Sequence, residues 1–233
     1  MTDLSTLRFF STPAHACSYL EDRKATTLFV DPNAEITPEL YRELSSMGFR
    51  RSGDYLYRPH CKGCQACIPV RIPVQEFTLR RRHKRIMKRN SDLDVELIPA
   101  RFQMDLYRLY SRYIESRHVD GDMYPPSEEQ FASFLMSDWS ETHFCCFRLN
   151  GELVAVAVVD QLRKGLSAVY TFFDPNLATR SLGTYAILWQ IEHCQSEQIP
   201  HLYLGYWIRD CQKMSYKDQF APLEYFTDGH WYR

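Results

Sequence analysis

The chain has 233 residues, of which 45% are apolar and 14% aromatic, and its formal net charge is −1. It can therefore bury a substantial core, as one large domain or two small ones. It has no run near the roughly 18 uninterrupted apolar residues of a membrane span, and its start lacks the cationic and apolar regions of an export signal. Cys145, Cys146, Cys194 and Cys211 do not form a compact disulfide framework. We therefore expect a protein of the reducing cytoplasm, with no membrane partner.

Residues 1–56 contain short apolar pieces broken by turn residues, with one clear helix signal. Thr37 followed by Pro38 predicts a helix over 38–47, with Thr37 as its N-cap and Gly48 at its end. A turn over 50–54 then leads into a short predicted strand, 55–58.

Three cysteines follow within seven residues, namely Cys61, Cys64 and Cys67. Thiolates at this spacing suit zinc or an iron–sulfur cluster, but the set is one ligand short of four. Cys17, His60 or His15 would complete it through the fold, and spacing does not choose among them. Reduced thiols packed as small apolar side chains are the alternative. A metal at Cys17, Cys61, Cys64 and Cys67 therefore remains one of two open interpretations.

Positive charge is concentrated directly after the cysteines. The segment 71–90 carries eight Lys or Arg residues and one acid, Glu76, so its net charge is about +7 and that of the remaining chain is near −8. Clustered cations bind polyanions because they release condensed counterions from phosphates. A solvated basic helix on the surface is the alternative interpretation.

Two elements are predicted within and beside this basic segment. Ile68–Val74 is strand-like, and its two prolines favour an edge strand or an extended loop. A helix is predicted over 79–90, with Leu79, His83 and Ile86 on one stripe. The cations on its remaining circumference are Arg80, Arg81, Arg82, Lys84, Arg85, Lys88 and Arg89.

The second half of the chain has a more regular pattern. Helical spacing predicts a helix of about 16 residues from Phe102, and a capping box at Ser127 predicts another over 128–136. Asn150-Gly151 predicts a tight turn between two strands. The elements predicted around and after this turn are strands 144–149, 153–162 and 166–173, a helix from the turn at 180–185 through about residue 197, and a strand over 201–206.

This order of elements resembles the acyltransferase fold of the GNAT superfamily, in which a strand ends before an R-x-x-G turn that opens a helix. In that fold the backbone N–H groups of the turn hold an anion. Here the turn runs from Arg180 through Ser181, Leu182 and Gly183 to Tyr185, which replaces the usual small residue. The resemblance implies an α+β fold: a GNAT-like acyltransferase core with a mixed, largely antiparallel sheet flanked by helices, plus a smaller N-terminal cysteine-containing region. We divide the chain into 1–78 and 79–233.

Several segments in order look like the aminoacyl-tRNA protein transferases of the arginyltransferase family. They are Tyr57-Arg58-Pro59-His60-Cys61, the basic segment 80–90, Phe173-Asp174-Pro175, 181–185, 204–208 and 213–217. The short chain and the cysteine triad resemble the bacterial leucyltransferase branch most closely. The chain departs from the eukaryotic relatives after Cys17, since they carry a second cysteine three residues on.

The resemblance implies transfer of leucine from leucyl-tRNA to the α-amine of proteins that begin with Asp or Glu, which makes an N-degron. It implies no cofactor for the chemistry and no DNA partner. The basic helix, with the seven cations named above, is expected to bind tRNA phosphates. Arg180, Ser181, Leu182, Gly183 and Tyr185 are expected to hold the tRNA 3′ end and its aminoacyl group.

Two further pairs of residues are expected at the substrates. Arg58 and Arg71 would bind the acidic N-terminal residue, because guanidinium pairs with carboxylate in a bidentate way. Asp174 would orient or deprotonate the amine, or only cap its turn, and Tyr206 would donate to the tRNA terminus. Three alternatives stay open: arginyl transfer from arginyl-tRNA, a small-molecule acetyltransferase using acetyl coenzyme A, and a non-catalytic metal-containing RNA-binding module.

Overall fold

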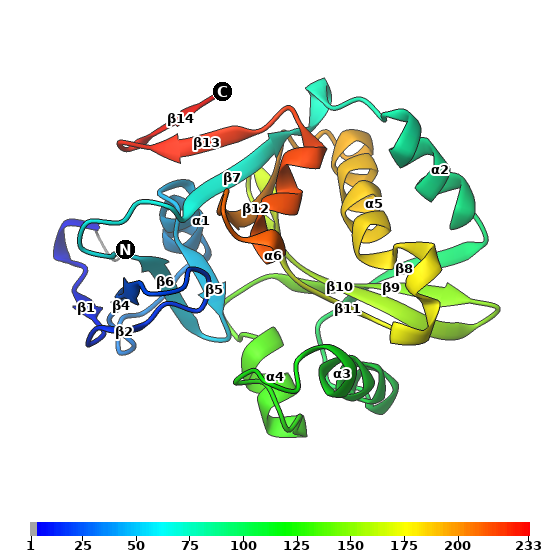
Figure 1. The fold of residues 1–233 in the computed structure, drawn as a ribbon, viewed down its shortest axis with the longest axis horizontal. Coiled ribbons are helices and arrows are strands. Elements are labelled where there is room, and N and C mark those ends of the chain that lie inside the picture. Colours follow the sequence, from blue (N-terminus) through cyan, green and yellow to red (C-terminus); the bar gives the residue numbers. More distant parts are fainter. Residues whose placement is uncertain (1–3) are drawn as a thin grey trace.

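The computed structural model describes residues 4–233 and has the α+β fold expected from the sequence (Figure 1). An eight-stranded sheet forms its body, in the order β14-β13-β7-β12-β11-β10-β9-β8. All its pairs are antiparallel except β11–β12, which is parallel. A smaller antiparallel sheet, β1-β4-β6-β5, and the pair β2-β3 lie in the N-terminal part of the chain. Residues 1–3 lie outside the described residues. They begin the N-terminal segment for which the sequence predicts no export signal.

The bounds of the elements are as follows. The large sheet comprises β7 (Ile68–Pro73), β8 (Leu93–Pro99), β9 (Thr142–Leu149), β10 (Glu152–Leu162), β11 (Gly165–Phe173), β12 (His201–Trp207), β13 (Glu224–Thr227) and β14 (His230–Tyr232). The remaining strands are β1 (Phe9–Ser11), β2 (His15–Ala16), β3 (Lys24–Ala25), β4 (Thr27–Val30), β5 (Arg50–Ser52) and β6 (Tyr55–Pro59). The α-helices are α1 (Pro38–Ser46), α2 (Arg81–Arg89), α3 (Met104–Arg117), α4 (Glu128–Leu135), α5 (Leu182–Ser196) and α6 (Gln212–Ser215). The 3₁₀ turns are η1 (Leu4–Thr6), η2 (Val74–Glu76), η3 (Pro175–Arg180) and η4 (Tyr216–Phe220).

Helices cover both faces of the large sheet. Helices α5 and α2 lie on one face and α3 and α4 on the other (Figure 1). Side chains alternate across β9, because successive residues of a strand point to opposite faces. Cys145 and Phe147 therefore pack under α5, and Phe144 and Cys146 pack under α3 and α4. This alternation explains why two adjacent cysteines are both fully buried.

Most of the predicted elements are confirmed, and the Asn150-Gly151 turn has the expected positive φ angles of 51° and 87°. The prediction that Ile68–Val74 is an edge strand or a loop is wrong. Strand β7 is paired on both sides, with β12 and with β13. Its prolines are tolerated because β13 pairs only with Val70 and Arg71, which lie between them. The sequence pattern also failed to predict β8, β13 and β14.

Strand β7 also bears on the division of the chain. It belongs to the large sheet, although it lies within the region 1–78. The boundary at residue 78 stays a prediction. Within residues 4–233, no helix is both long and apolar enough to cross a membrane.

A buried polar network joins the N-terminal sheet to the large one. The Arg51 guanidinium donates to both carboxylate oxygens of Asp160, at 2.7 and 2.8 Å, and both side chains are fully buried. The Tyr41 hydroxyl donates to Asp160 at 2.6 Å and the Thr142 hydroxyl at 2.7 Å. One carboxylate on β10 therefore fixes α1, β5 and β9 together.

Helix α2 packs on the rest of the protein through the stripe of side chains that the sequence predicts to be buried. His83 and Ile86 are buried, and all seven cations are exposed. The His83 ring is stacked between Phe77 and Phe220, with centroids 5.5 and 5.8 Å away. Burial, followed by the charges of Arg80 and Arg82, lowers the pKa of His83 below its ordinary value.

This lowered pKa predicts a specific dependence of stability on pH. The unfolded histidine takes up a proton near pH 6.5, about its ordinary pKa, whereas the folded one stays neutral to lower pH. The contribution of neutral His83 to stability is therefore complete above about pH 6.5 and is lost as the pH falls from there toward the folded pKa. We expect the wild type to lose stability relative to His83→Phe between about pH 7.5 and 5. Denaturant unfolding of both proteins across this pH range measures the difference in their free energies of unfolding. A difference that does not change with pH would contradict the prediction.

Candidate active site

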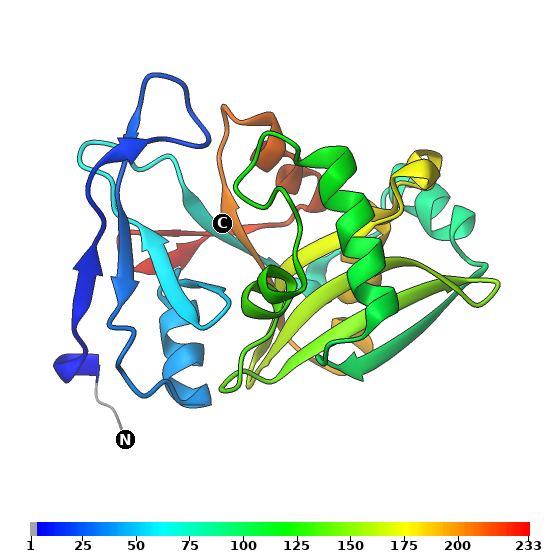
Figure 2. The same ribbon diagram turned by 90° about the horizontal axis from the view of Figure 1, so that it is seen from below.

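The two parallel strands of the large sheet separate soon after they begin. Strands β11 and β12 pair only at Leu166–Leu202 and Ser167–Tyr203, and Figure 2 shows them diverging beyond these pairs. We call the region between residues 168–173 of β11 and 204–207 of β12 the strand split. Segment α6–η4 follows β12 and packs on it. The carboxyl end of β11 leads to Asp174 and then to helix α5.

Arg50 joins the two strands where they separate. Its guanidinium donates to the Ser167 hydroxyl at 2.9 Å and to the Ala168 carbonyl of β11. On the β12 side, a Cβ atom at Gly205 would lie 3.2 Å from Arg50 Nε, and Gly205 has a φ of +77°. Glycine is therefore favoured at position 205 for two reasons. Its backbone has a positive φ, and a side chain there would crowd the Arg50 guanidinium.

Asp174 caps the turn after β11. One carboxylate oxygen accepts the backbone N–H of Asn176 at 2.9 Å, as the sequence predicts for a capping role. The other lies 3.8 Å from the guanidinium of Arg112 on α3. Its side chain is 21% exposed, so it can also meet a substrate amine.

Helix α5 begins directly after this turn. Ser181 has a left-handed φ of 56° and forms no side-chain cap, so the first N–H groups of α5 lack a side-chain acceptor. Gly183 allows the helix to approach Phe173, since a Cβ atom there would lie 3.3 Å from its ring. Leu182 and Tyr185 are buried in the core under α5. The backbone of this turn, and not these two side chains, is what the structure offers to a ligand.

Arg180 is bound within the protein. Its guanidinium forms two 2.8 Å hydrogen bonds to Asp92, which lower the pKa of that carboxyl. Arg89 in turn donates to the Thr179 carbonyl, and the Asn90 amide donates to the Arg180 carbonyl at 3.0 Å. These bonds fix the C-terminus of α2 against the turn that opens α5. The basic helix and the α5 N-terminus therefore form one continuous surface.

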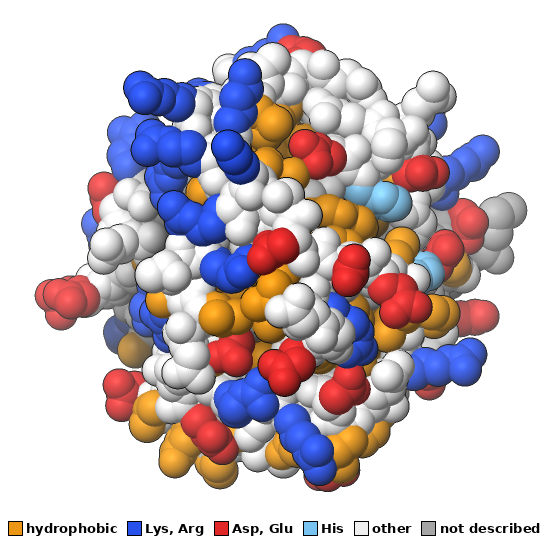
Figure 3. All heavy atoms as spheres, turned by 90° about the vertical axis from the view of Figure 1, so that its right-hand side faces the viewer, with side chains coloured by type: hydrophobic (Ala, Val, Ile, Leu, Met, Phe, Trp, Pro, Cys, Tyr) orange, Lys and Arg blue, Asp and Glu red, His pale blue; other side chains and the backbone are white. Residues whose placement is uncertain are grey.

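The cations of α2 gather on one part of the surface. Figure 3 views this side and shows Lys and Arg side chains gathered in its upper part. The exposed members of α2 and its N-cap are Arg80, Arg81, Arg82, Lys84, Arg85, Lys88 and Arg89. In the part of the chain that the structure describes, none of them forms an ion pair with a carboxylate. This surface is free to bind phosphates.

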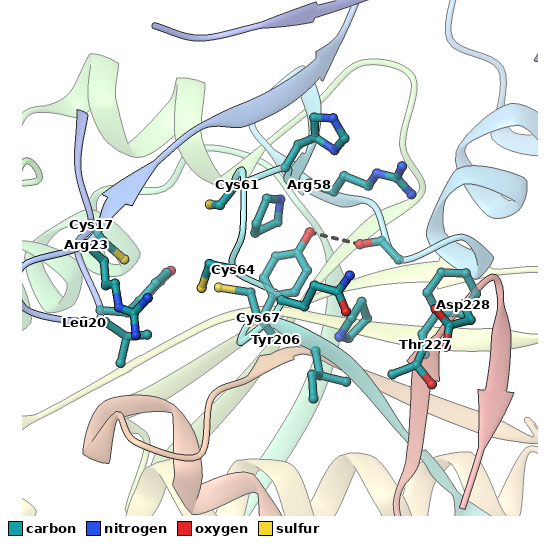
Figure 4. A pocket seen from close by; sticks show the side chains of 18 of the residues that line it. Cys17, Leu20, Arg23, Arg58, Cys61, Cys64, Cys67, Tyr206, Thr227 and Asp228 are labelled. Atoms are coloured by element: carbon teal, nitrogen blue, oxygen red, sulfur yellow. Dashed lines mark hydrogen bonds between the residues drawn. The ribbon is translucent and has the colours of Figure 1, made fainter. Parts of the chain in front are cut away.

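The four cysteines that the sequence singled out line one pocket of about 390 Å³ (Figure 4). Cys17, and not His15, joins Cys61, Cys64 and Cys67 there, with His60 beside them. Burial and the neighbouring thiols raise the pKa of Cys67 to about 12, so its thiol is protonated at neutral pH. Across residues 4–233, no group of three or more His, Cys, Asp or Glu side chains is arranged to hold a metal ion. The donors therefore do not fit the zinc or iron–sulfur site that the spacing left open.

The same pocket is lined by unpaired cations. Arg58 lies over the Phe49 ring at 5.1 Å, and Arg23 and Lys24 also line the pocket. Of the carboxylates that the structure describes, none forms an ion pair with these three side chains. Asp228 contributes one carboxylate to the lining, so three cations and one acid face this pocket.

Arg71 is not brought together with Arg58. It donates to Glu224 at 2.6 Å and to the Tyr203 hydroxyl at 3.0 Å, and it stacks 4.3 Å from the Trp231 ring. Its charge is therefore already neutralised.

Tyr206 lines the pocket, but its hydroxyl is engaged. It donates to the Gly48 carbonyl at 2.9 Å and lies 3.3 Å from that of Tyr57 (Figure 4). Burial raises the pKa of Tyr206 well above its ordinary value. These contacts give Tyr206 a structural role, holding the N-terminal sheet against β12.

Sequence reasoning missed two cations of the strand split, Arg50 and Lys217. Arg50 carries no functional pattern in the sequence, and the predicted turn over 50–54 is wrong at this residue, because Arg50 begins strand β5. Lys217 lies in one of the segments that carry the family resemblance, but its burial depends on the fold.

Known proteins resemble this chain over its whole length. Two family descriptions match it: "Arginine-tRNA-protein transferase, N terminus" over residues 15–85 and the C terminus of the same family over residues 105–227. Proteins named aspartate/glutamate leucyltransferase are similar to it at 68% identity in Alcanivorax borkumensis, 56% in Marinobacter nauticus and 54% in Hahella chejuensis. Each match covers 99% of this chain and at least 96% of the relative.

A solved structure, L-PGS from Bacillus licheniformis, is 10% identical with a TM-score of 0.47, covering 87% of this chain and 69% of that one. The assignment depends on the sequence matches, which span both halves of the chain at high identity. The chain belongs to the arginine-tRNA-protein transferase family.

Proposed function

We propose that this protein transfers leucine from leucyl-tRNA to the α-amine of proteins beginning with Asp or Glu, in the cytoplasm, and thereby makes an N-degron. The observation that carries the proposal is its 68% identity, over 99% of the chain, to a protein named aspartate/glutamate leucyltransferase. The continuous surface of α2 and the α5 N-terminus supports it, because a tRNA must reach the catalytic centre with its acceptor end while its phosphates meet cations.

The chemistry needs positioning more than an added cofactor. The amine nitrogen attacks the carbonyl carbon of the aminoacyl ester, and the bond to the tRNA ribose oxygen breaks. Because the ester is already activated, we propose that no cofactor takes part, and that the enzyme orients the amine and stabilises the developing oxyanion. Asp174 is proposed to orient the ammonium, and the backbone of residues 180–185 to hold the tRNA 3′ end.

Recognition of the acidic N-terminus is proposed for Arg58. Its guanidinium lies in a pocket beside two further cations and lacks an ion-pair partner among residues 4–233. Arg71 is less suited, because Glu224 already neutralises it. A carboxylate in this pocket would pair with a charge that the fold has left uncompensated.

The test uses four peptides that differ only in their first residue, Asp, Glu, Asn or Gln, with labelled leucyl-tRNA. We expect leucylation of the Asp and Glu peptides, and a loss of at least about 30-fold with Asn and Gln, since the arginine then lacks its charged partner. Arg58→Met should reduce kcat/KM for the acidic peptides toward the amide values. Arg163→Met, at an exposed arginine in the β10–β11 turn, is the matched control.

Several outcomes would contradict this proposal. Absence of leucylated product would refute the transferase function. Transfer from arginyl-tRNA in a parallel reaction would change the donor, and acetylation by acetyl coenzyme A without tRNA would favour a small-molecule acetyltransferase. Unchanged acidic selectivity in Arg58→Met would refute the role of Arg58 alone.

A further inference from the structure

Lys217 is a buried cation without an anionic partner. Only 4% of it is exposed. Its Nζ lies 3.6 Å from the Met214 sulfur and 4.8 Å from the centroid of the Tyr216 ring. Of the carboxylates in residues 4–233, none forms an ion pair with it. A thioether and an aromatic face are weak partners, so this environment shifts the equilibrium from the ammonium toward the neutral amine, compared with an exposed lysine.

The lysine belongs to the segment that lies at the strand split. Turn η4 packs on β12, and the Trp207 indole donates to the Ser215 carbonyl at 3.3 Å. The neighbouring Tyr216 is within electrostatic reach of Tyr113 on α3 and of Arg50. Tyr113 in turn contacts Phe173, the residue before Asp174, at a ring distance of 5.0 Å. The segment that carries Lys217 therefore packs on the β12 side of the strand split, and the charge of Arg50, which bonds to β11 there, acts on Lys217 itself.

The pKa of Lys217 is lowered toward neutral pH. Burial, followed by the charge of Arg50, lowers its pKa to about 8, and Cys211 acts in the opposite direction. The α-amino group of a peptide has a pKa of about 7.7–8.0. The lowered pKa of Lys217 is closer to that of the α-amine than the pKa of an ordinary lysine is, which favours proton transfer between the two.

We propose that Lys217, as the neutral amine, removes the proton that the acceptor's α-ammonium must lose before it attacks the ester. This role rests on the function proposed above. An N–H bond of the ammonium breaks, and the Lys217 nitrogen takes the proton. The freed amine forms the new C–N bond, and the C–O bond to the tRNA ribose breaks. Two protons leave the amine nitrogen in all: one ends on the ribose oxygen, and the other passes to solvent.

Two substitutions separate this role from others. Lys217→Met keeps the length and apolar stem of the side chain without a basic nitrogen. Lys217→Arg keeps a cation that does not act as a base near neutral pH. Because the lysine has no anionic partner, its replacement by Met should leave the midpoint of unfolding and tRNA binding near the wild-type values. Lys164→Met, at an exposed lysine of the β10–β11 turn, is the matched control.

The decisive comparison uses two acceptors of the same sequence. One has the ordinary α-amine, and the other has an aminooxy group in its place, which arrives already neutral at pH 7. With the amine acceptor we expect both Lys217 variants to lose about 10²- to 10⁴-fold in kcat/KM at about pH 7.5. With the aminooxy acceptor we expect a loss below about tenfold, because little base catalysis is required.

The outcomes that overturn the base role differ from those that overturn the proposed function. Equal losses with both acceptors, or full activity of Lys217→Arg, would overturn the base role and leave the transferase function standing. Full activity of Lys217→Met would do the same. Wild-type protein that leucylates neither acceptor would overturn the proposed function and the base role with it.

Discussion

Replacing Asp160 by Ala should lower the free energy of unfolding by about 3–5 kcal/mol, because it leaves a buried guanidinium without its partner. Arg51 and Asp160 are fully buried and share two hydrogen bonds. The substitution also removes the acceptor of the Tyr41 and Thr142 hydroxyls. Chemical unfolding of wild type and variant measures the loss directly.

The double variant Arg51→Met, Asp160→Ala tests the mechanism. If the cost of Asp160→Ala comes from the orphaned charge, removing the arginine as well should restore part of the stability. Glu76→Ala provides the control, since Glu76 pairs with Arg233 at the surface, where both side chains are about half exposed. A surface pair should contribute less than about 1 kcal/mol. Equal losses at Asp160 and Glu76 would show that the buried network does not hold the two sheets together.

This network also bears on the strand split. Arg50 directly precedes Arg51, and it is the residue that joins β11 to β12 at the strand split. Loss of the Arg51 anchor should therefore disturb Arg50 and lower activity even under conditions where the variant stays folded.

Replacing Arg81, Arg82 and Arg85 by Ala should weaken tRNA binding about 10- to 100-fold at about 0.1 M salt. These three side chains are exposed, and α2 is held by His83 and Ile86 on its opposite stripe, so the helix should persist. Each lost phosphate contact should reduce the slope of log Kd against log salt by about 1. Binding titrations at several salt concentrations measure both effects.

The choice of residues matters in this experiment. Arg89 is excluded because it bonds to the Thr179 carbonyl, so its loss would also loosen the turn before α5. The control replaces an equal number of exposed cations elsewhere, namely Arg101, Arg163 and Lys164. A control with the same loss of affinity would indicate a general effect of net charge, and an unchanged salt slope in the α2 variant would make α2 a solvated face only.

The proposed function assigns the two substrates to two different surfaces of the molecule. The α2 surface and the N-terminus of α5 are joined by the Arg180–Asp92 pair on one side of the large sheet. The cation-lined pocket that contains Arg58 lies next to Tyr206 on β12. In the proposed reaction the tRNA approaches from the first side and the acceptor protein from the second, and Lys217 acts on the acceptor's α-ammonium.

The sequence by itself determined most of the elements of the second half of the chain and the face that α2 buries. Turn chemistry at Asn150-Gly151, the capping residues Thr37 and Ser127, and the stripe of α2 are local signals, and each is confirmed. The ordered family segments are also local, and they identified the family without the fold.

Only the tertiary structure decided which charges are neutralised and which are left uncompensated. Arg71 and Arg58 are equivalent in the sequence, yet the register of β7 with β13 places Glu224 against Arg71 and leaves Arg58 in an open pocket. The same holds for Lys217, whose burial depends on the packing of η4 on β12. Periodicity records the side of an element that faces the core, whereas electrostatic character depends on partners that are distant in the sequence.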